Sequence, residues 1–438
     1  MDNIEEGGYG WVIVGISFVC MFVGNGIALS FGLMGPNIIH NLKATTSQAV
    51  AVGSTSFGLT FMTCIIICCL SNFVACKKIS LSGAVLGVLA CISSAFMTSI
   101  EGLTITFGIL LGIALGMLNI PVLLLVNQYF HKKRAIAYGL AVSGTPIGTF
   151  VISLLMGVAL KFLTIQTIYF IMAGVLAICG LLCLLLKPPA ANEEKYCSLS
   201  IRNESSPNII FRKFCAALID GQVTQNCYFL FYLLGRSFAS LGANIPHYVL
   251  PILIEQRAME KSASSNAGIY NNKKVFCLMD NMIAFLVALL GLSNGLGRIS
   301  SGLVSLYPKC LLVVQAAACI VAGISTMFFP HCPNADVLYV LTFVFGLVTG
   351  PVVALETVSC VAFVGQDYVG TSLGWVDFAY GFFSLMSPVV VGHLIDVYEE
   401  MFLPLYIIGG CHFCAAAIFL GTHFCQKKKC DDKEYQKF

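Results

Sequence analysis

Long apolar runs with few or no charged residues recur along the chain and set its architecture. Each run holds about 20 residues or more, the length of helix that crosses a hydrocarbon core about 30 Å thick. The runs cover residues 10–34, 48–74, 79–100, 103–128, 135–158, 165–186, 226–254, 279–305, 310–329, 336–364, 368–393 and 401–425. This pattern predicts an all-α membrane protein with twelve transmembrane helices.

The longest polar stretch between these runs lies near the middle of the chain. It extends from Lys187 to Gln225 and contains three prolines and several charged residues. It divides the spans six plus six, so we predict two six-helix bundles. The predicted parts are an N-terminal bundle (1–186), a central loop (187–225), a C-terminal bundle (226–425) and a tail (426–438).

The composition supports a membrane protein and excludes other classes. Of the 438 residues, 58% are hydrophobic and 10% are charged, whereas soluble domains carry about 25% charged residues. Lipid is therefore the expected surrounding. The 24 Lys and Arg residues against 21 Asp and Glu residues leave no basic excess for a nucleic-acid partner. Most of the 20 cysteines lie inside apolar runs, where we expect them to pack as small hydrophobic side chains.

Basic residues in the loops predict the orientation, because loops rich in Lys and Arg stay in the cytosol. With both termini and the central loop on one side, that side collects 16 Lys and Arg residues and the other collects 6. We therefore expect both termini and the central loop to be cytosolic, and the sequon at Asn203 to carry no glycan. Cys425 and Cys430 flank a lysine triplet. A palmitoylated cysteine and a plain thiol are alternative interpretations of these two residues.

Ionisable residues inside the spans are the first candidates for function, because a charge in hydrocarbon is expensive. Away from their ends, the first six predicted spans contain none and the second six contain four: Arg236, Arg298, Glu356 and Asp377. Helix rise of about 1.5 Å per residue places all four at a similar depth. Two buried ion pairs are one interpretation, and a substrate or proton site is the other.

Arg298 differs from the other three charges in its immediate neighbourhood. The residue one turn before it on the same helix face is Asn294, and a neutral amide is not a counter-ion. A guanidinium binds a carboxylate through two parallel hydrogen bonds, so we interpret Arg298 as an anion site. An ion pair with Asp377 or Glu356 is the alternative.

Other residue patterns do not predict chemistry. His247, His393 and His412 lie on different spans without a second ligand at metal-binding spacing, so we expect structural roles and no metal or cofactor. Ser372 lies in a G-x-S-x-G pattern, but a nucleophile elbow needs a strand–turn–helix, and here the pattern begins an apolar helix. We therefore expect no enzyme activity. The sequence also lacks the P-loop pattern that an ATP-driven pump would need.

Two long motifs stand at one end of the first bundle. The first is Glu6-Gly7-Gly8-Tyr9-Gly10-Trp11, and the second runs from Tyr129-Phe130 through Lys133-Arg134, Gly139 and Gly144 to Gly148. Both resemble signatures of the monocarboxylate transporters, a family of the major facilitator superfamily. Asn294-Gly295-Leu296-Gly297-Arg298 is similar to that family's eighth-span motif. The likeness therefore runs along most of the chain.

The resemblance implies two six-helix bundles around a central path, with alternating access to the two sides of the plasma membrane. The family's lactate carriers take the proton on a lysine in the first span and use an acid-x-x-x-arginine pair in the eighth. Here the corresponding turn of the first span reads Ile27-Ala28-Leu29-Ser30, and Asn294 replaces the acid. A facilitative or weakly proton-coupled carrier is the simpler expectation, and a proton-coupled lactate or pyruvate symporter is the alternative.

We predict a small organic anion as substrate and Arg298, Asn294, Asn25 and Asn119 as substrate-binding residues. Candidates for proton coupling or ion pairing are Asp377, Glu356, Arg236 and His247. Members of the family often travel with a single-span immunoglobulin-like glycoprotein, a partner that the resemblance leaves open here. A transporter-shaped sensor or scaffold that carries nothing is a further alternative.

Overall fold

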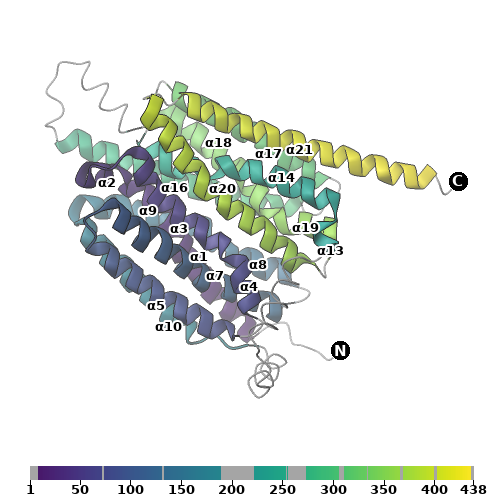
Figure 1. The fold of residues 1–438 in the computed structure, drawn as a ribbon, viewed down its shortest axis with the longest axis horizontal. Coiled ribbons are helices and arrows are strands. Elements are labelled where there is room, and N and C mark those ends of the chain that lie inside the picture. The colour runs from purple at the N-terminus through teal and green to yellow at the C-terminus, as the bar shows by residue number, and fades with distance from the viewer. Residues whose placement is uncertain are drawn as a thin grey trace.

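The computed structural model describes residues 8–71, 74–130, 133–188, 221–252, 254, 273–304, 310–332, 334–365, 368–398 and 402–435. Within these ranges, all regular secondary structure is helical (Figure 1). Eleven of the described helical segments are long and apolar enough to cross a membrane. The all-α membrane fold predicted from the sequence is therefore confirmed.

The first six predicted spans are occupied by helices that are mostly continuous, with short breaks. They are α1 (Tyr9–Ser30) with η1 (Phe31–Met34) and α2 (Gly35–Leu42), α3 (Thr46–Met62) with α4 (Cys64–Leu70), α5 (Cys76–Ala95), α6 (Ile100–Leu103) with η2 (Thr104–Leu110) and α7 (Leu111–Tyr129), α8 (Arg134–Val142) with α9 (Gly144–Phe162), and α10 (Ile165–Cys183).

The second half of the chain follows the same plan. Its elements are α13 (Gly221–Thr224), α14 (Cys227–Ala243), α16 (Lys273–Val304), α17 (Leu311–Phe328) with η5 (Phe329–His331), α18 (Ala335–Ala354) with α19 (Glu356–Val364), α20 (Val369–Tyr398) and α21 (Phe402–Tyr435). The last of these continues past residue 425, where the sequence predicts the end of the span, and projects beyond the other helices in Figure 1.

The seventh predicted span is not one helix. α14 has 17 residues and ends at Ala243, Asn244 forms a turn, and residues 245–252 are helical again. Pro246 explains the break, because proline lacks the N–H that would bond back to residue 242 and its ring displaces that carbonyl. The seventh predicted span is not among the eleven described segments that are long and apolar enough to cross a membrane.

A second proline shapes the contact between α16 and α18. Pro351 lies inside α18, which ends at Ala354, and it leaves the carbonyl of Leu347 without an intrahelical partner. Gly297 of α16 packs directly on that carbonyl: a Cβ atom added at Gly297 would lie 2.1 Å from the Leu347 oxygen. The missing side chain therefore lets two helix backbones touch, as small residues do in membrane proteins.

Contacts between helices define two groups that meet along two helix pairs. α1 packs on α9, and α5 packs on both α7 and α10; α14 and α17 pack on α21, and α16 packs on α18. The two groups touch where α3 lies along α20 and where α9 lies along α16. The predicted domain limits stay predictions, because residues 189–220, with Asn203, lie outside the described residues, as do Glu6 and Gly7.

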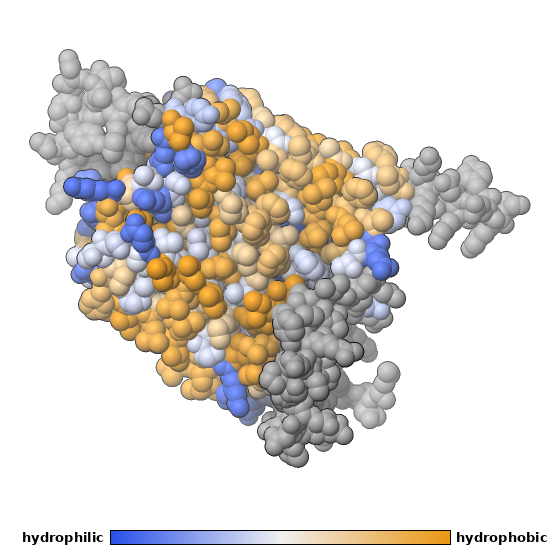
Figure 2. All heavy atoms as spheres, in the orientation of Figure 1, coloured by the Kyte–Doolittle hydropathy of each residue, from blue (hydrophilic) through white to orange (hydrophobic). Residues whose placement is uncertain are grey.

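The surface suits a lipid environment. The face in Figure 2 is covered mainly by apolar side chains, and hydrophilic residues gather toward its ends. Large apolar side chains are exposed on several helices: Phe162 is 81% exposed, Ile299 72% and Phe96 67%. Such a surface would be unfavourable in water, whereas in hydrocarbon it contacts lipid tails.

Candidate functional site

Arg298 lies in the last third of α16, and its hydrogen-bond partner is neutral. It is partly buried on α16, and its Nε donates to Oδ1 of Asn294, one turn earlier, at 2.9 Å. The described residues place no carboxylate in ion-pair contact with this guanidinium. Because Nε is occupied, the two terminal amino groups are the donors suited to a bidentate carboxylate.

Neighbouring groups fix the orientation of Asn294. Its Nδ2 donates to Thr349 Oγ1 of α18 at 3.2 Å, and that hydroxyl donates to the carbonyl of Phe345. α16 and α18 approach closely here, since a Cβ atom added at Gly350 would lie 2.4 Å from the Asn294 carbonyl oxygen. The amide therefore holds the guanidinium through a chain of neutral hydrogen bonds.

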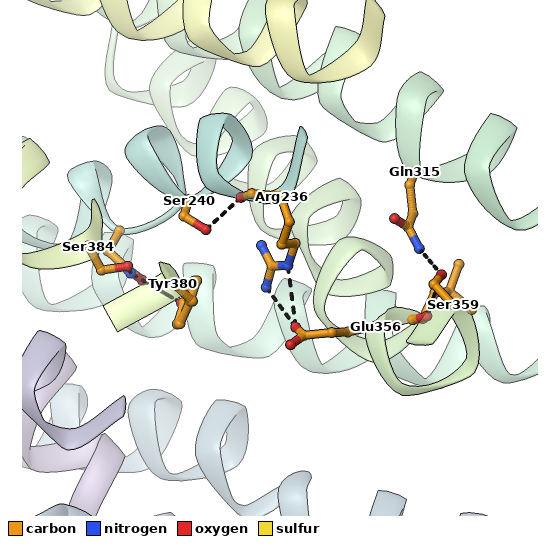
Figure 3. Close-up of polar contacts among 9 residues, drawn as sticks. Arg236, Ser240, Gln315, Glu356, Ser359, Tyr380 and Ser384 are labelled. Carbon is orange, nitrogen blue, oxygen red and sulfur yellow. Dashed lines mark hydrogen bonds and ion pairs between the residues drawn. The ribbon is translucent and has the colours of Figure 1, made fainter. Parts of the chain in front are cut away.

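Arg236 and Glu356 form a buried ion pair, one of the interpretations that the sequence leaves open (Figure 3). Nε and Nη2 of Arg236 donate to Oε2 of Glu356 at 3.3 and 3.0 Å. The two side chains are 1% and 8% exposed. The guanidinium also lies over the ring of Tyr380, with 4.9 Å from its carbon to the ring centroid. Burial of both charges is tolerated because each is compensated by the other.

A polar network connects this ion pair with the break in the seventh span. Asn244 Nδ2 donates to the Tyr380 hydroxyl at 3.1 Å and to Ser384 Oγ at 2.9 Å. Tyr380 also carries the cation–π contact with Arg236 (Figure 3). α14, the turn at Asn244 and α20 are therefore held together by side chains that bond to one another.

Asp377 lies where α20 meets α4, and the structure gives it a thiol partner. Cys64 Sγ donates to Asp377 Oδ2 at 3.6 Å, and the Cys68 sulfur is 3.8 Å from that of Cys64. Asp377 is partly buried. With Arg236 and Glu356 compensating each other, Asp377 and Arg298 are the membrane charges without an ion pair among the described residues.

Asn25 and Asn119 are nearly inaccessible, at 2% exposure each. Asn25 Nδ2 donates to Thr145 Oγ1 at 2.9 Å, joining α1 to α9. Among the described residues, Oδ1 of Asn25 and both amide atoms of Asn119 have no hydrogen-bond partner. Buried amides normally find partners, so these atoms are available for a water molecule or a polar substrate group.

By the family resemblance, Ile27–Ser30 is the turn of the first span where lactate carriers have their lysine. Here it is neutral, and the Ser30 hydroxyl has a hydrogen-bond partner. The hydroxyl groups of Ser30 and Ser153 share a hydrogen bond of 2.8 Å between α1 and α9, and both residues are fully buried. The sequence predicts a turn without a lysine; the partner on α9 was not predictable from it.

The predicted histidines have packing roles or lie at the surface. His412 is buried and its Nδ1 is 3.2 Å from the carbonyl oxygen of Ile408. His247 is 9% exposed and its Nδ1 has no partner among the described residues. His393 is exposed. Ser372 is fully buried within helix α20, so it is not presented on a strand–turn–helix as a nucleophile elbow requires.

The first signature motif packs on the second and on the end of α10. The Trp11 ring meets the Phe130 ring edge-on, with centroids 5.0 Å apart, and Gly10 leaves room for that ring. The Tyr9 hydroxyl donates to the Leu185 carbonyl, and the Tyr129 hydroxyl donates to the Lys187 carbonyl at 3.0 Å.

The other signature residues have separate surroundings. Gly8 has φ +63°, a conformation that favours glycine, and Gly144 packs on the Phe18 carbonyl. Gly139 has open space around it. Lys133 is exposed, and Arg134 begins α8. The signatures therefore build one end of the first bundle.

Comparison with known proteins agrees with this fold. The model of the Major Facilitator Superfamily matches residues 14–388, which is most of the chain. The protein belongs to the major facilitator superfamily and is a secondary transporter, not an enzyme.

Curated relatives narrow the class further. Monocarboxylate transporter 4 of Gallus gallus is 24% identical over 437 residues, covering 97% of this chain and 85% of that protein. Monocarboxylate transporter 10 of Mus musculus is 23% identical over 421 residues, covering 92% and 76%. The family resemblance seen in the motifs is therefore confirmed.

Solved structures support the same fold. The crystal structure of the nucleoside transporter NupG superposes with a TM-score of 0.67 and 15% identity, covering 95% of this chain and 99% of that one. At this identity the likeness concerns the arrangement of the helices alone.

Proposed function

We propose that the protein is a facilitative carrier of monocarboxylates or related organic anions in the plasma membrane, with weak or no proton coupling. The observation that carries this proposal is Arg298, a partly buried arginine in a membrane span whose partner is the neutral amide of Asn294. A substrate carboxylate supplies the charge that the described residues do not. The names of the curated relatives, as monocarboxylate transporters, support the same substrate class.

Asn25 and Asn119 are proposed to contact the polar part of the substrate from the first bundle. Their unpartnered atoms are both donors and acceptors, which suits a hydroxyl or carbonyl group. Access to them requires movement, since each is 2% exposed in this conformation. They are therefore proposed to act when the two bundles rearrange around the substrate.

We propose that proton coupling is weak or absent because the side chains at two positions are neutral. Ser30 is bonded to Ser153 at the turn where the lactate carriers titrate a lysine, and Asn294 stands where they have an acid. Neither side chain exchanges protons near neutral pH. A proton-coupled symporter is the second candidate, and Asp377 favours it, because this carboxylate lies in the membrane span with a thiol as its partner.

The test is uptake of labelled monocarboxylates into proteoliposomes that contain the purified protein. Arg298→Ala should weaken transport about 10- to 100-fold, as expected for loss of a charge-assisted hydrogen bond of about 1.5–3 kcal/mol. Arg298→Lys should retain part of it, because lysine keeps the charge and loses the planar fork. Lys78→Ala, which removes an exposed positive charge, is the matched control and should transport normally.

Two results would count against the proposal. Normal transport by correctly folded Arg298→Ala would remove Arg298 from the substrate site. Failure of the unmodified protein to move any monocarboxylate, with its fold intact, would favour the sensor or scaffold instead.

A further inference from the structure

Hydrogen bonds join the two bundles at one end of the molecule. We call this the distal end: it carries α2 and the first turn of α3, and it lies on the left in Figure 1, away from both chain termini. α20 ends there as well, since Asp396 near its C-terminal end contacts Thr46 and Ser47 at the start of α3. The contacts at the distal end join spans that must separate if a substrate is to enter from that side.

Asp396 of α20 makes the contact with the strongest electrostatic character. Its Oδ1 accepts the backbone N–H of Thr46 at 3.0 Å, and its Oδ2 accepts the backbone N–H of Ser47 at 2.8 Å. These N–H groups open α3 and have no partner within the helix. A carboxylate at a helix N-terminus is stabilised by the N–H groups and by the helix dipole.

α3 does not need Asp396 in order to begin. Thr45 and Gln48 already form a reciprocal capping box at the same helix start, with bonds of 3.3 and 3.0 Å. Because Thr45 and Gln48 already cap the start of α3, the helix can form without a second cap from the opposite bundle. The Asp396 contact therefore contributes mainly to holding the two bundles together.

A second contact at the distal end comes from the segment after the break in the seventh span. The buried Tyr248 hydroxyl lies 3.2 Å from the carbonyl oxygens of Ala28 and Gly53. Gly32 packs on the His247 carbonyl so closely that any side chain there would overlap it. Residues 245–252 therefore pack on α1, η1 and α3.

Glycines of α20 and α16 show how closely the two bundles approach each other. Along α20, a Cβ atom added at Gly392 or Gly381 would meet α3 backbone atoms at 2.7 or 2.5 Å, whereas at Gly374 the nearest atom is 3.7 Å away. Along α16, the corresponding distances are 2.7 Å at Gly291 and 3.3 Å at Gly295. The backbones of α20 and α3 are therefore in close contact from Gly392 to Gly381, and the approach of α20 to the first bundle is looser at Gly374.

We propose that Asp396 acts as a latch that keeps the distal end closed. Its bidentate hydrogen bond to the start of α3 sets how often the carrier opens to that side, and we call the contacts that separate there the distal gate. Opening removes both N–H groups from the carboxylate at once, so the charge favours the closed state. With the predicted topology, the distal end faces the cell exterior. The proposal concerns the transport cycle and stands whichever anion is carried.

The experiment measures opening directly and does not require transport. Val50 lies one turn after Ser47 on the same face of α3 and is 3% exposed, so Val50→Cys places a thiol that reacts only when the gate opens. Its labelling by a bulky membrane-impermeant maleimide is followed in right-side-out and in inverted vesicles. The protein without the added thiol gives the background of the native cysteines.

Asp396→Asn should raise the labelling rate at position 50 about tenfold in one vesicle orientation, a factor within the range of helix-dipole interactions. Asp396→Glu should keep most of the slow rate, because it retains the carboxylate. Asp336→Asn is the matched control, since it removes an exposed carboxylate from the first turn of α18, and it should change nothing.

Three outcomes would overturn the latch. Equal labelling with and without Asp396→Asn would show that the carboxylate does not hold the gate. Acceleration by Asp396→Glu as large as that by Asp396→Asn would assign the effect to packing and not to charge. Acceleration that is equal in both vesicle orientations would indicate general loosening of the fold.

Discussion

Removing one member of the Arg236–Glu356 pair should destabilise the protein strongly, whereas removing both should not. The side chains are 1% and 8% exposed, so a charge left alone cannot be hydrated in place. Loss of one partner of a buried pair costs about 3–5 kcal/mol, while replacement of both by apolar side chains is often neutral. We expect Arg236→Met and Glu356→Leu each to lower the unfolding free energy by about 3–5 kcal/mol.

The double variant tests whether the two charges stabilise the protein as a pair or through two independent contributions. If the charges compensate each other, Arg236→Met with Glu356→Leu should be more stable than either single variant, with a coupling energy of about 3 kcal/mol or more. Arg236→Met should be the more harmful single change, because it also removes the stacking on Tyr380, worth about 2 kcal/mol when desolvated.

Unfolding of the purified protein in mixed micelles, followed by tryptophan fluorescence, gives the four free energies. Gln315 and Ser359 provide a control pair: both are buried, and Gln315 Nε2 donates to Ser359 Oγ at 2.9 Å without any charge (Figure 3). Gln315→Leu and Ser359→Ala should couple by about 1 kcal/mol. A double Arg236→Met/Glu356→Leu variant that loses the sum of the two single losses would refute the reasoning.

Two further predictions concern orientation and protons. Protease added outside intact cells should not cut the 187–225 loop, and Asn203 should carry no glycan; cleavage there or a glycan would reverse the assigned sides. In proteoliposomes with the outside one pH unit more acid, substrate should equilibrate, whereas accumulation near tenfold, or about 1.4 kcal/mol, would establish proton coupling and make Asp377→Asn the next variant to measure.

The sequence predicts the spans well because their signal is local. A run of about 20 apolar residues fixes a membrane helix regardless of its neighbours. The break at Asn244 had a local signal as well, in Pro246, which counting the length of the run 226–254 does not take into account. Helix ends were less predictable: α21 extends to Tyr435 because the polar residues after 425 continue the helix outside the apolar run.

Partners of the charged residues could not be predicted, for a geometric reason. Rise per residue gives the depth of Arg236 or Glu356 along its own helix, but the direction of each side chain depends on which helices are neighbours. The two residues are 120 positions apart, and the order of α14 and α19 around the bundle is a tertiary property. Thus the sequence identified both residues as candidates and left pairing and function as alternatives.

Two other tertiary contacts were missed altogether. Ser30 with Ser153, and Asp396 with the start of α3, join residues 123 and about 350 positions apart. A serine inside a span has no distinguishing pattern, since its hydroxyl can also bond to its own helix backbone. The partners of Asp396 are backbone groups, which no residue type reveals.

Arg298 leads to a last prediction, that exchange of substrate is faster than net transport. When the two bundles close around the site, an empty carrier must take a guanidinium with a neutral partner out of water. The penalty for such a charge is several kcal/mol, and a bound carboxylate offsets it. The loaded carrier should therefore change sides more readily than the empty one.

The measurement is efflux of labelled substrate from proteoliposomes, with and without unlabelled substrate outside. External substrate should accelerate efflux in the unmodified protein. Asn294→Asp is the informative variant, because Asn294 Oδ1 already lies 2.9 Å from Arg298 Nε, so a carboxylate there supplies a built-in counter-ion for the empty carrier. The acceleration should shrink in this variant. Equal efflux with and without external substrate in the unmodified protein, or an unchanged ratio in Asn294→Asp, would show that the charge of Arg298 does not limit the return of the empty carrier.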